Sequence, residues 1–80
     1  MLKEQDMNAK WHKFPDEKPS ATGEYLLRGI GGLNNKLHHW VCLWVAECDD
    51  PRIAHRFFYG GNEFNNVPSG QFEWLDLKEL

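Results

Sequence analysis

Residues 38–48 read HHWVCLWVAEC, and this stretch decides how the chain can fold. Side chains alternate between the two faces of a strand, so a strand with one wet face usually alternates apolar with polar residues. Here both faces are apolar, with Val41, Leu43 and Val45 on one and Trp40, Cys42, Trp44 and Ala46 on the other. The sequence therefore predicts a strand that needs cover on both sides.

The size of the chain makes that requirement hard to meet within one molecule. Its 80 residues allow a single domain. A domain of this length buries only about 60–65% of the surface of its unfolded chain, so its core is marginal. Aromatic residues make up 14% of the chain, which favours packing or binding over disorder.

Charge and apolar content limit the partners that the chain can have. The formal net charge is -3, so the sequence lacks the basic stripe that DNA binding normally requires. Its start, MLKEQDMNAK, has no apolar signal-peptide core, and no apolar run reaches the roughly 20 residues of a membrane helix. We expect a soluble cytoplasmic protein that does not bind membranes.

Turn-forming residues divide the chain into short extended segments. We expect strands at 24–30, 38–48, 53–59, 63–67 and 72–75. Pro15 and Pro19 argue against a regular helix or a central strand in 11–23, which we interpret as an entry loop. The pattern predicts a mainly β domain over 11–80, with four to five antiparallel strands in a meander, long loops and little or no helix. Residues 1–10 are polar and predict a flexible N-terminal tail.

The two cysteines do not suit a disulfide. Cys42 and Cys48 are six residues apart, and on one strand they would lie about 20 Å apart at about 3.3 Å per residue. A disulfide needs Cα atoms within about 7 Å of each other. We expect two reduced thiols that act as small apolar side chains.

The spacing of histidines and cysteines gives little support to a metal site or to a catalytic cysteine. His38 and Cys42 would share a strand face but lie about 13 Å apart, and His39 would point to the opposite face. This spacing differs from that of zinc sites, whose ligands are closely spaced. Cys42 or Cys48 could pair with His55, but neither thiol follows a known nucleophile motif or lies at a helix N-terminus. We predict no metal site.

The acidic and glycine-rich stretches also lack a catalytic pattern. Glu47, Asp49 and Asp50 lie at a strand end before a proline, which is typical of a solvated turn. A glycosidase-like carboxylate pair would need a cleft that a chain this short rarely builds. GIGG at 29–32 lacks the pattern of a phosphate-binding loop. We therefore predict a protein that is not an enzyme, with no catalytic residues and no cofactor.

Two uses remain for the tryptophan face of the long strand. Trp40, Trp44, Phe57 and Tyr59 could form a stacking platform for single-stranded nucleic acid. The cations close to them are few: Lys36, Arg52 and Arg56. The alternative that we favour is a protein-binding surface, because aromatic side chains are enriched at interface centres. The predicted contact residues are the aromatic anchors Trp40, Trp44, Phe57 and Tyr59 and the acidic rim Glu47, Asp49 and Asp50.

We expect the entry loop to cover the rest of the tryptophan face through Trp11 and Phe14. One of Trp40 and Trp44 would then be structural and the other partly exposed.

Three motifs together resemble a known family. They are W-x-x-x-P-D-E-x-P-x-x-x-G-E-Y-L-L from Trp11 to Leu27, W-V-A-E at 44–47 and F-E-W-L-D-L at 72–77. The chain is similar in these motifs to short phage and prophage proteins of domain-of-unknown-function family 551. It departs from their closing segment at Glu73, where histidine is usual, and at Asp76, where proline is usual.

The resemblance implies a phage or mobile-element origin and no activity, because the family has no assigned catalytic residues. Small acidic phage proteins often bind and block a bacterial protein, which by analogy suggests the cytoplasm of a bacterial host. The expected partner is a host protein, such as a nucleic-acid-handling defence nuclease of the CRISPR type. Under this interpretation the protein is an anti-CRISPR-like inhibitor, and a homodimer is compatible with the sequence.

Overall fold

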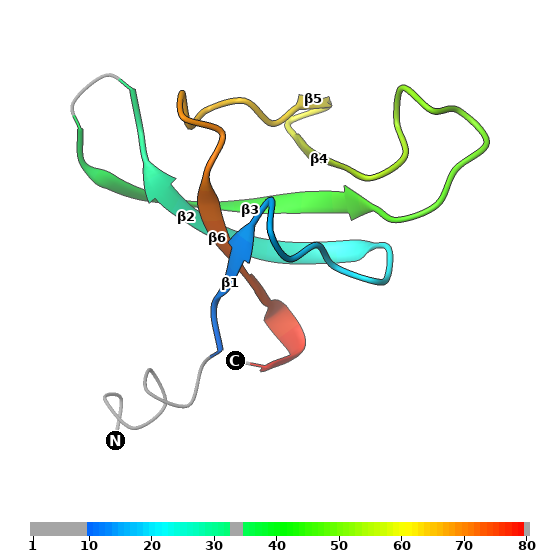
Figure 1. Ribbon diagram of the computed structural model, residues 1–80, viewed down its shortest axis with the longest axis horizontal. Helices are drawn as coiled ribbons and strands as arrows, with labels where there is room; N and C mark the ends of the chain where they lie inside the picture. Colours follow the sequence, from blue (N-terminus) through cyan, green and yellow to red (C-terminus); the bar gives the residue numbers. More distant parts are fainter. Residues whose placement is uncertain (1–9, 33–34, 80) are drawn as a thin grey trace.

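The long apolar strand is the centre of the sheet (Figure 1). In the computed structural model, which describes residues 10–32 and 35–79, it is strand β3 (Leu37–Val45). Strand β2 (Gly23–Ile30) is antiparallel to β3 along its whole length, with Tyr25 opposite Cys42 and Leu27 opposite Trp40. These two strands contribute Tyr25, Leu27, Cys42 and Trp44 to the buried core.

Four shorter strands complete one antiparallel sheet with the order β1-β6-β2-β3-β4-β5. They are β1 (His12–Phe14), β4 (Arg56–Tyr59), β5 (Asn62–Glu63) and β6 (Phe72–Asp76), and a short 3-10 helix η1 (Leu77–Glu79) follows the last. The mainly β, antiparallel fold is therefore confirmed, although six strands replace the expected four to five. The meander holds only for β2 to β5, because β6 returns across the molecule to pair with β2.

The short strands differ from expectation for local reasons. β1 lies inside the expected entry loop. Pro15, which has no backbone N–H to donate, comes directly after the strand and so does not interrupt its pairing. β4 starts at Arg56 instead of residue 53, because the amides of Ile53 and Ala54 donate to the Asp50 carbonyl at 3.0 and 3.1 Å in a turn.

The ends of β3 and β5 also differ from expectation. β3 ends at Val45 rather than at residue 48. The amide of the next residue, Ala46, donates to the Thr22 hydroxyl at 2.9 Å instead of to a strand partner. β5 ends at Glu63 rather than continuing to residue 67. The expected tail 1–10 lies outside the described residues except for Lys10.

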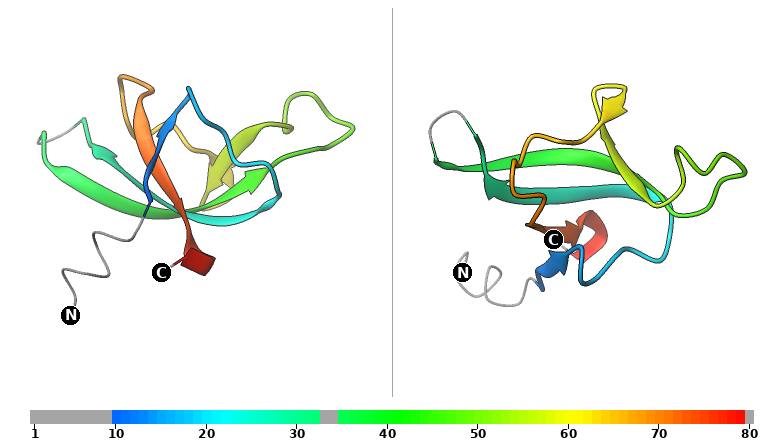
Figure 2. Two further views of the ribbon diagram at one scale, coloured as in Figure 1. Left: turned by 60° about the horizontal axis from the view of Figure 1, so that its bottom comes forward. Right: turned by 45° about the horizontal axis from the view of Figure 1, so that its top comes forward.

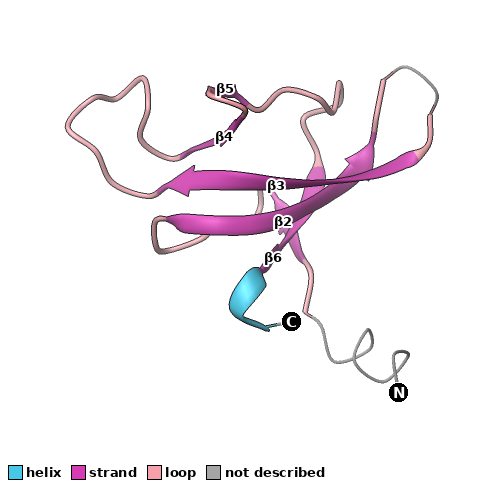
Figure 3. Ribbon diagram, turned by 180° about the vertical axis from the view of Figure 1, so that it is seen from behind, coloured by secondary structure: helices cyan, strands magenta, loops and turns pink. Residues whose placement is uncertain are grey.

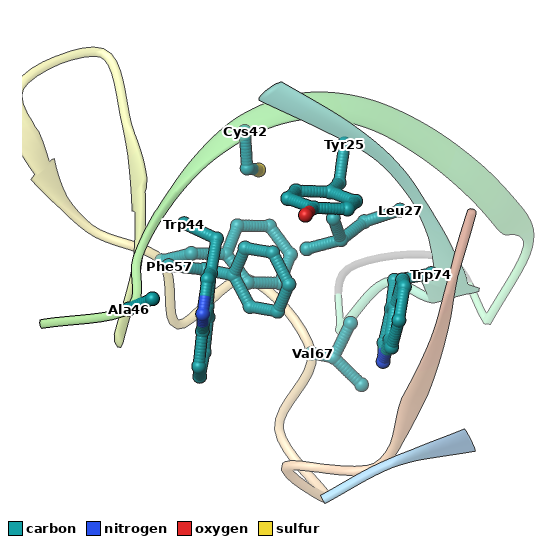
Figure 4. Packing of buried hydrophobic residues seen from close by; sticks show 9 residues of the cluster. Tyr25, Leu27, Cys42, Trp44, Ala46, Phe57, Val67 and Trp74 are labelled. Carbon is teal, nitrogen blue, oxygen red and sulfur yellow. The ribbon is translucent and has the colours of Figure 1, made fainter. Parts of the chain in front are cut away.

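The tryptophan face of β3 is the core of the molecule. Figure 2 shows the sheet curving around one side, and Figure 4 shows the aromatic side chains gathered there. Trp44 has 0% of its surface exposed, and its ring lies 4.7 Å from that of Phe57 and 6.0 Å from that of Phe14. Phe14 stacks on Phe72 at 4.6 Å, so the short edge strand β1 is tied to the core by its side chain.

Two side-chain hydrogen bonds hold the loop after β1 against the sheet. The Trp74 indole N–H donates to the Glu17 carbonyl at 2.8 Å, and the Tyr25 hydroxyl donates to the Ala21 carbonyl at 2.8 Å. Burial raises the pKa of Tyr25, with a smaller contribution from the charge of Asp76. The hydroxyl therefore stays protonated and able to donate at neutral pH.

The two central tryptophans should contribute unequally to stability. Trp44→Ala should lower the free energy of unfolding by about 3–5 kcal/mol, because it leaves a cavity in the core. That loss approaches the whole stability of a small domain, roughly 5 kcal/mol or somewhat more. Trp40→Ala should cost less, because Trp40 is only half-buried and packs on Phe64.

Urea unfolding followed by circular dichroism would measure the difference, with Tyr59→Ala at an exposed site as the control. Equal losses for the two tryptophan variants would show that Trp40 is as structural as Trp44.

Candidate interaction surface

The face of the sheet that points away from the core, here called the outer face, exposes apolar side chains on β3 and at the end of β2. Its large exposed side chains are Ile30 (49%), Leu37 (54%), Val41 (49%) and Leu43 (43%). The strand register places Ile30 opposite Leu37, and it places Leu26 opposite Val41. The exposed side chains are therefore neighbours, and contiguous patches of this kind mark interaction sites in small proteins.

The outer face continues onto β4 and is covered near β6. Leu43 lies opposite the half-buried Phe58 of β4. Toward β6, the Arg28 guanidinium lies 3.9 Å from the centre of the Trp11 ring, and its Nε donates to Glu73 at 2.7 Å. Trp11 also meets His39 edge-on at 6.3 Å. Trp11 therefore covers part of the outer face, whereas Phe14 packs into the core.

One end of the outer face carries exposed carboxylates. Glu24 lies opposite Leu43, and Glu47 and Asp49 follow the end of β3. Among the described residues, none of these three acids takes part in an ion pair. This end of the surface is therefore negatively charged.

Asp50 differs from the acids beside it because it is already occupied. Its carboxylate accepts hydrogen bonds from the Arg52 guanidinium at 3.0 and 2.9 Å and from the Arg52 amide at 2.9 Å. These bonds lower the pKa of Asp50. Asp50 therefore closes a turn and leaves the predicted acidic rim, which keeps Glu47 and Asp49.

The predicted aromatic anchors lie in two environments. Trp44 and Phe57 have 0% and 3% of their surface exposed, so neither can contact a partner on the folded surface. Trp40 is half-buried and Tyr59 is 44% exposed, and both rings contact Phe64. The stacking platform for nucleic acid does not form as expected, because its two central rings are in the core.

The sequence alone did not show which face of β3 is buried, because both faces are apolar. The neighbouring strand β2 indicates which face of β3 is buried. Glu24 and Arg28 alternate with Tyr25 and Leu27, so β2 has a polar and an apolar face. The polar face pairs with the Val41 side of β3, which identifies that side as the solvent side.

The two cysteines lie in different environments. Burial raises the pKa of Cys42 to about 12, so this thiol is protonated at neutral pH and is a poor nucleophile. Cys48 is exposed, and both cysteines are free. Among the described residues, no group of three or more His, Cys, Asp or Glu side chains is placed to hold a metal ion.

A hollow of about 420 Å³ lies between β1 and β4. Four phenylalanines line this hollow, and so do Arg56 and Glu63, which form an ion pair with a 3.0 Å contact.

No helix in the described part of the chain has the length and apolar character needed to cross a membrane. No family model matches the sequence, and no curated protein or solved structure is significantly similar to it.

The two thiols should differ strongly in reactivity. In the native protein at pH 8, a thiol reagent should modify Cys48 within minutes, because it is exposed. Cys42 should react only when the protein unfolds, because it is buried and protonated.

Mass spectrometry of the alkylated protein, native and in denaturant, would measure both rates, with Cys48→Ser as the control. A protein that takes up no label at either site in denaturant without a reductant would indicate a disulfide.

Proposed function

We propose that the protein is a non-enzymatic binding module that occupies the surface of another protein through its outer face. The observation that carries this proposal is the contiguous exposure of Ile30, Leu37, Val41 and Leu43 on a sheet whose other face already holds the core. Burying apolar area of this kind stabilises a complex by about 25 cal/mol per Å² before the costs of association.

The charge at one end of the outer face suggests the chemistry of the partner. Glu24, Glu47 and Asp49 favour a partner that presents Lys or Arg beside an apolar patch. Nucleic-acid-handling enzymes carry such basic surfaces. The more specific proposal is a bacterial host protein of this class, such as a CRISPR nuclease blocked by a mobile-element protein. It rests on the sequence resemblance and on analogy.

Lysine substitutions on the outer face should abolish partner capture without unfolding the protein. Leu43→Lys puts a charge in the middle of the apolar patch, at a side chain that is already 43% exposed. It should weaken binding at least about 30-fold, the size of a hot-spot loss of about 2 kcal/mol. Proteins retained from a bacterial lysate by wild type and lost with this variant are the candidate partners.

The matched control is Tyr59→Lys, which adds the same charge at a site of similar exposure outside the outer face. A partner retained equally by wild type and Leu43→Lys, but lost with Tyr59→Lys, would place the interface at the Trp40–Phe64–Tyr59 cluster.

The exposed acids should act mainly on the association rate. A Glu47→Gln/Asp49→Asn double variant should associate more slowly with a captured partner, and the difference should shrink at high salt, because exposed charges are screened. Asp50→Asn is the matched control, since Arg52 already occupies that carboxylate. Surface plasmon resonance at two salt concentrations would test this. Equal rates for both variants and wild type would remove the acidic end from the interface.

A further inference from the structure

β3 is longer than the strand that pairs with its far side. β4 is in register with Leu43 to Val45 alone, whereas β2 pairs with β3 from Leu37 to Trp44. Residues 37–42 therefore have a strand neighbour on one side only among the described strands. Figure 3 shows this part of β3 extending beyond the end of β4.

The hydrogen-bond pattern identifies which backbone groups face the open side. Bonded and non-bonded pairs alternate along an antiparallel ladder. The Gly31 amide donates to the Lys36 carbonyl at 3.1 Å, so the pairs two residues further along, Gly29 with His38 and Leu27 with Trp40, are bonded pairs as well. On β3, the residues whose bonds face β2 therefore alternate with Leu37, His39 and Val41. The backbone amides and carbonyls of these three residues point away from β2.

This edge has none of the features that usually protect a strand from pairing with another chain. Edge strands are typically short or carry lysine, proline or a bulge. β5 has two residues, and β1 has three and is followed by Pro15. The open part of β3 contains no lysine and no proline, and two of its three exposed side chains, Leu37 and Val41, are apolar, while the third is His39.

We propose that the open edge of β3 pairs with the same edge of a second copy of the chain. The two strands run antiparallel across a two-fold axis at His39. Leu37 of each copy then lies opposite Val41 of the other, and His39 lies opposite its own equivalent. The amides and carbonyls of these three residues find partners, and the two sheets become one.

The sequence of the edge is self-complementary, which is why a second copy fits better than an unrelated strand. Rotation about His39 superposes the pattern Leu37-x-His39-x-Val41 on its reverse, so apolar side chains meet apolar side chains on the outer face. The segment 37–41 contains no carboxylate or lysine, so the pairing brings no permanent like charges together.

The area covered by five paired residues falls below the roughly 1,000 Å² of a stable interface, so the dimer should form reversibly as concentration rises. The dimer does not depend on the proposed function. It would, however, join the outer faces of two copies into one larger apolar surface.

Amide hydrogen exchange followed by NMR tests the pairing residue by residue. In dilute protein, the amides of His39 and Val41 should exchange much faster than those of Trp40 and Cys42, which face β2. At millimolar concentration, exchange at His39 and Val41 should slow at least about tenfold, while Trp40 and Cys42 change little. Unchanged exchange at His39 and Val41, or protection of both already in dilute protein, would overturn the proposal.

A matched pair of variants at the two-fold axis provides the second test. His39→Pro removes the amide that the pairing uses but no bond to β2, whereas His39→Ala keeps the amide. Analytical ultracentrifugation should show a dimer for wild type and His39→Ala and a monomer for His39→Pro. A dimer in all three would place self-association elsewhere.

If His39→Pro fails to fold, as judged by circular dichroism, His39→Lys replaces it. Two lysines would then face each other, and the dissociation constant should rise several-fold. A dissociation constant unchanged from wild type would overturn the proposal.

Leu43→Lys separates this inference from the proposed function. The backbone of Leu43 already pairs with Phe58, so this variant should keep the dimer while losing the partner. Loss of the dimer with Leu43→Lys would show that copies meet through the outer face instead of the edge, which would overturn the edge pairing.

Discussion

The burial of Trp44 determines the rest of the structure. Its side chain is the largest of those with no exposed surface, and it lies against Phe57 and Phe14 from two other strands. Its indole N–H has no acceptor among the described residues, which costs about 1–3 kcal/mol. Burial of a tryptophan contributes about 4–6 kcal/mol before other costs, so the hydrophobic term exceeds the lost hydrogen bond.

The position of Trp44 leaves no choice for its neighbours on β3. Side chains two residues apart share a face, so Cys42 joins the core, while Val41 and Leu43 must point outward. A chain of this size cannot build a second layer of its own over a whole sheet. The entry segment covers one region of the outer face with Trp11, which lies over Arg28. The remaining apolar surface stays exposed, and its exposure follows from the burial of Trp44.

The sequence was informative where structure is local. Alternation and turn residues located β2, β3 and β6 to within a few residues, because strand pattern and turn chemistry are short-range properties. β1 was missed, because three residues beside a proline form a strand only when β6 is present to pair with them. The return of β6 to β2 was missed for a related reason, since pairing between residues far apart leaves no mark in either segment alone.

The candidate site was only partly predictable for similar reasons. Two apolar faces on β3 carry no information about which one is buried until the register with β2 is known, and Glu24 and Arg28 then decide it. Glu47 and Asp49, which the sequence suggested as rim residues, are exposed, whereas the carboxylate of Asp50 is paired with Arg52.

The open edge of β3 follows from the same small core. After β4 the chain reverses at Gly60 and Gly61, whose positive φ angles of 60° and 87° favour glycine. Phe64 and Val67 must then reach the core, so the chain leaves the ladder after β5 instead of extending β4 along β3.

Val67 packs closely against the backbone of β2 at Gly29. A Cβ atom at Gly29 would lie 2.9 Å from Val67 Cγ2 and 3.1 Å from Phe72 Cβ. A longer β4 would pair with more residues of β3. It would also remove Phe64 and Val67 from the core, which has few other side chains to replace them. Closing the core and leaving the β3 edge open are therefore two results of one limit, the length of the chain.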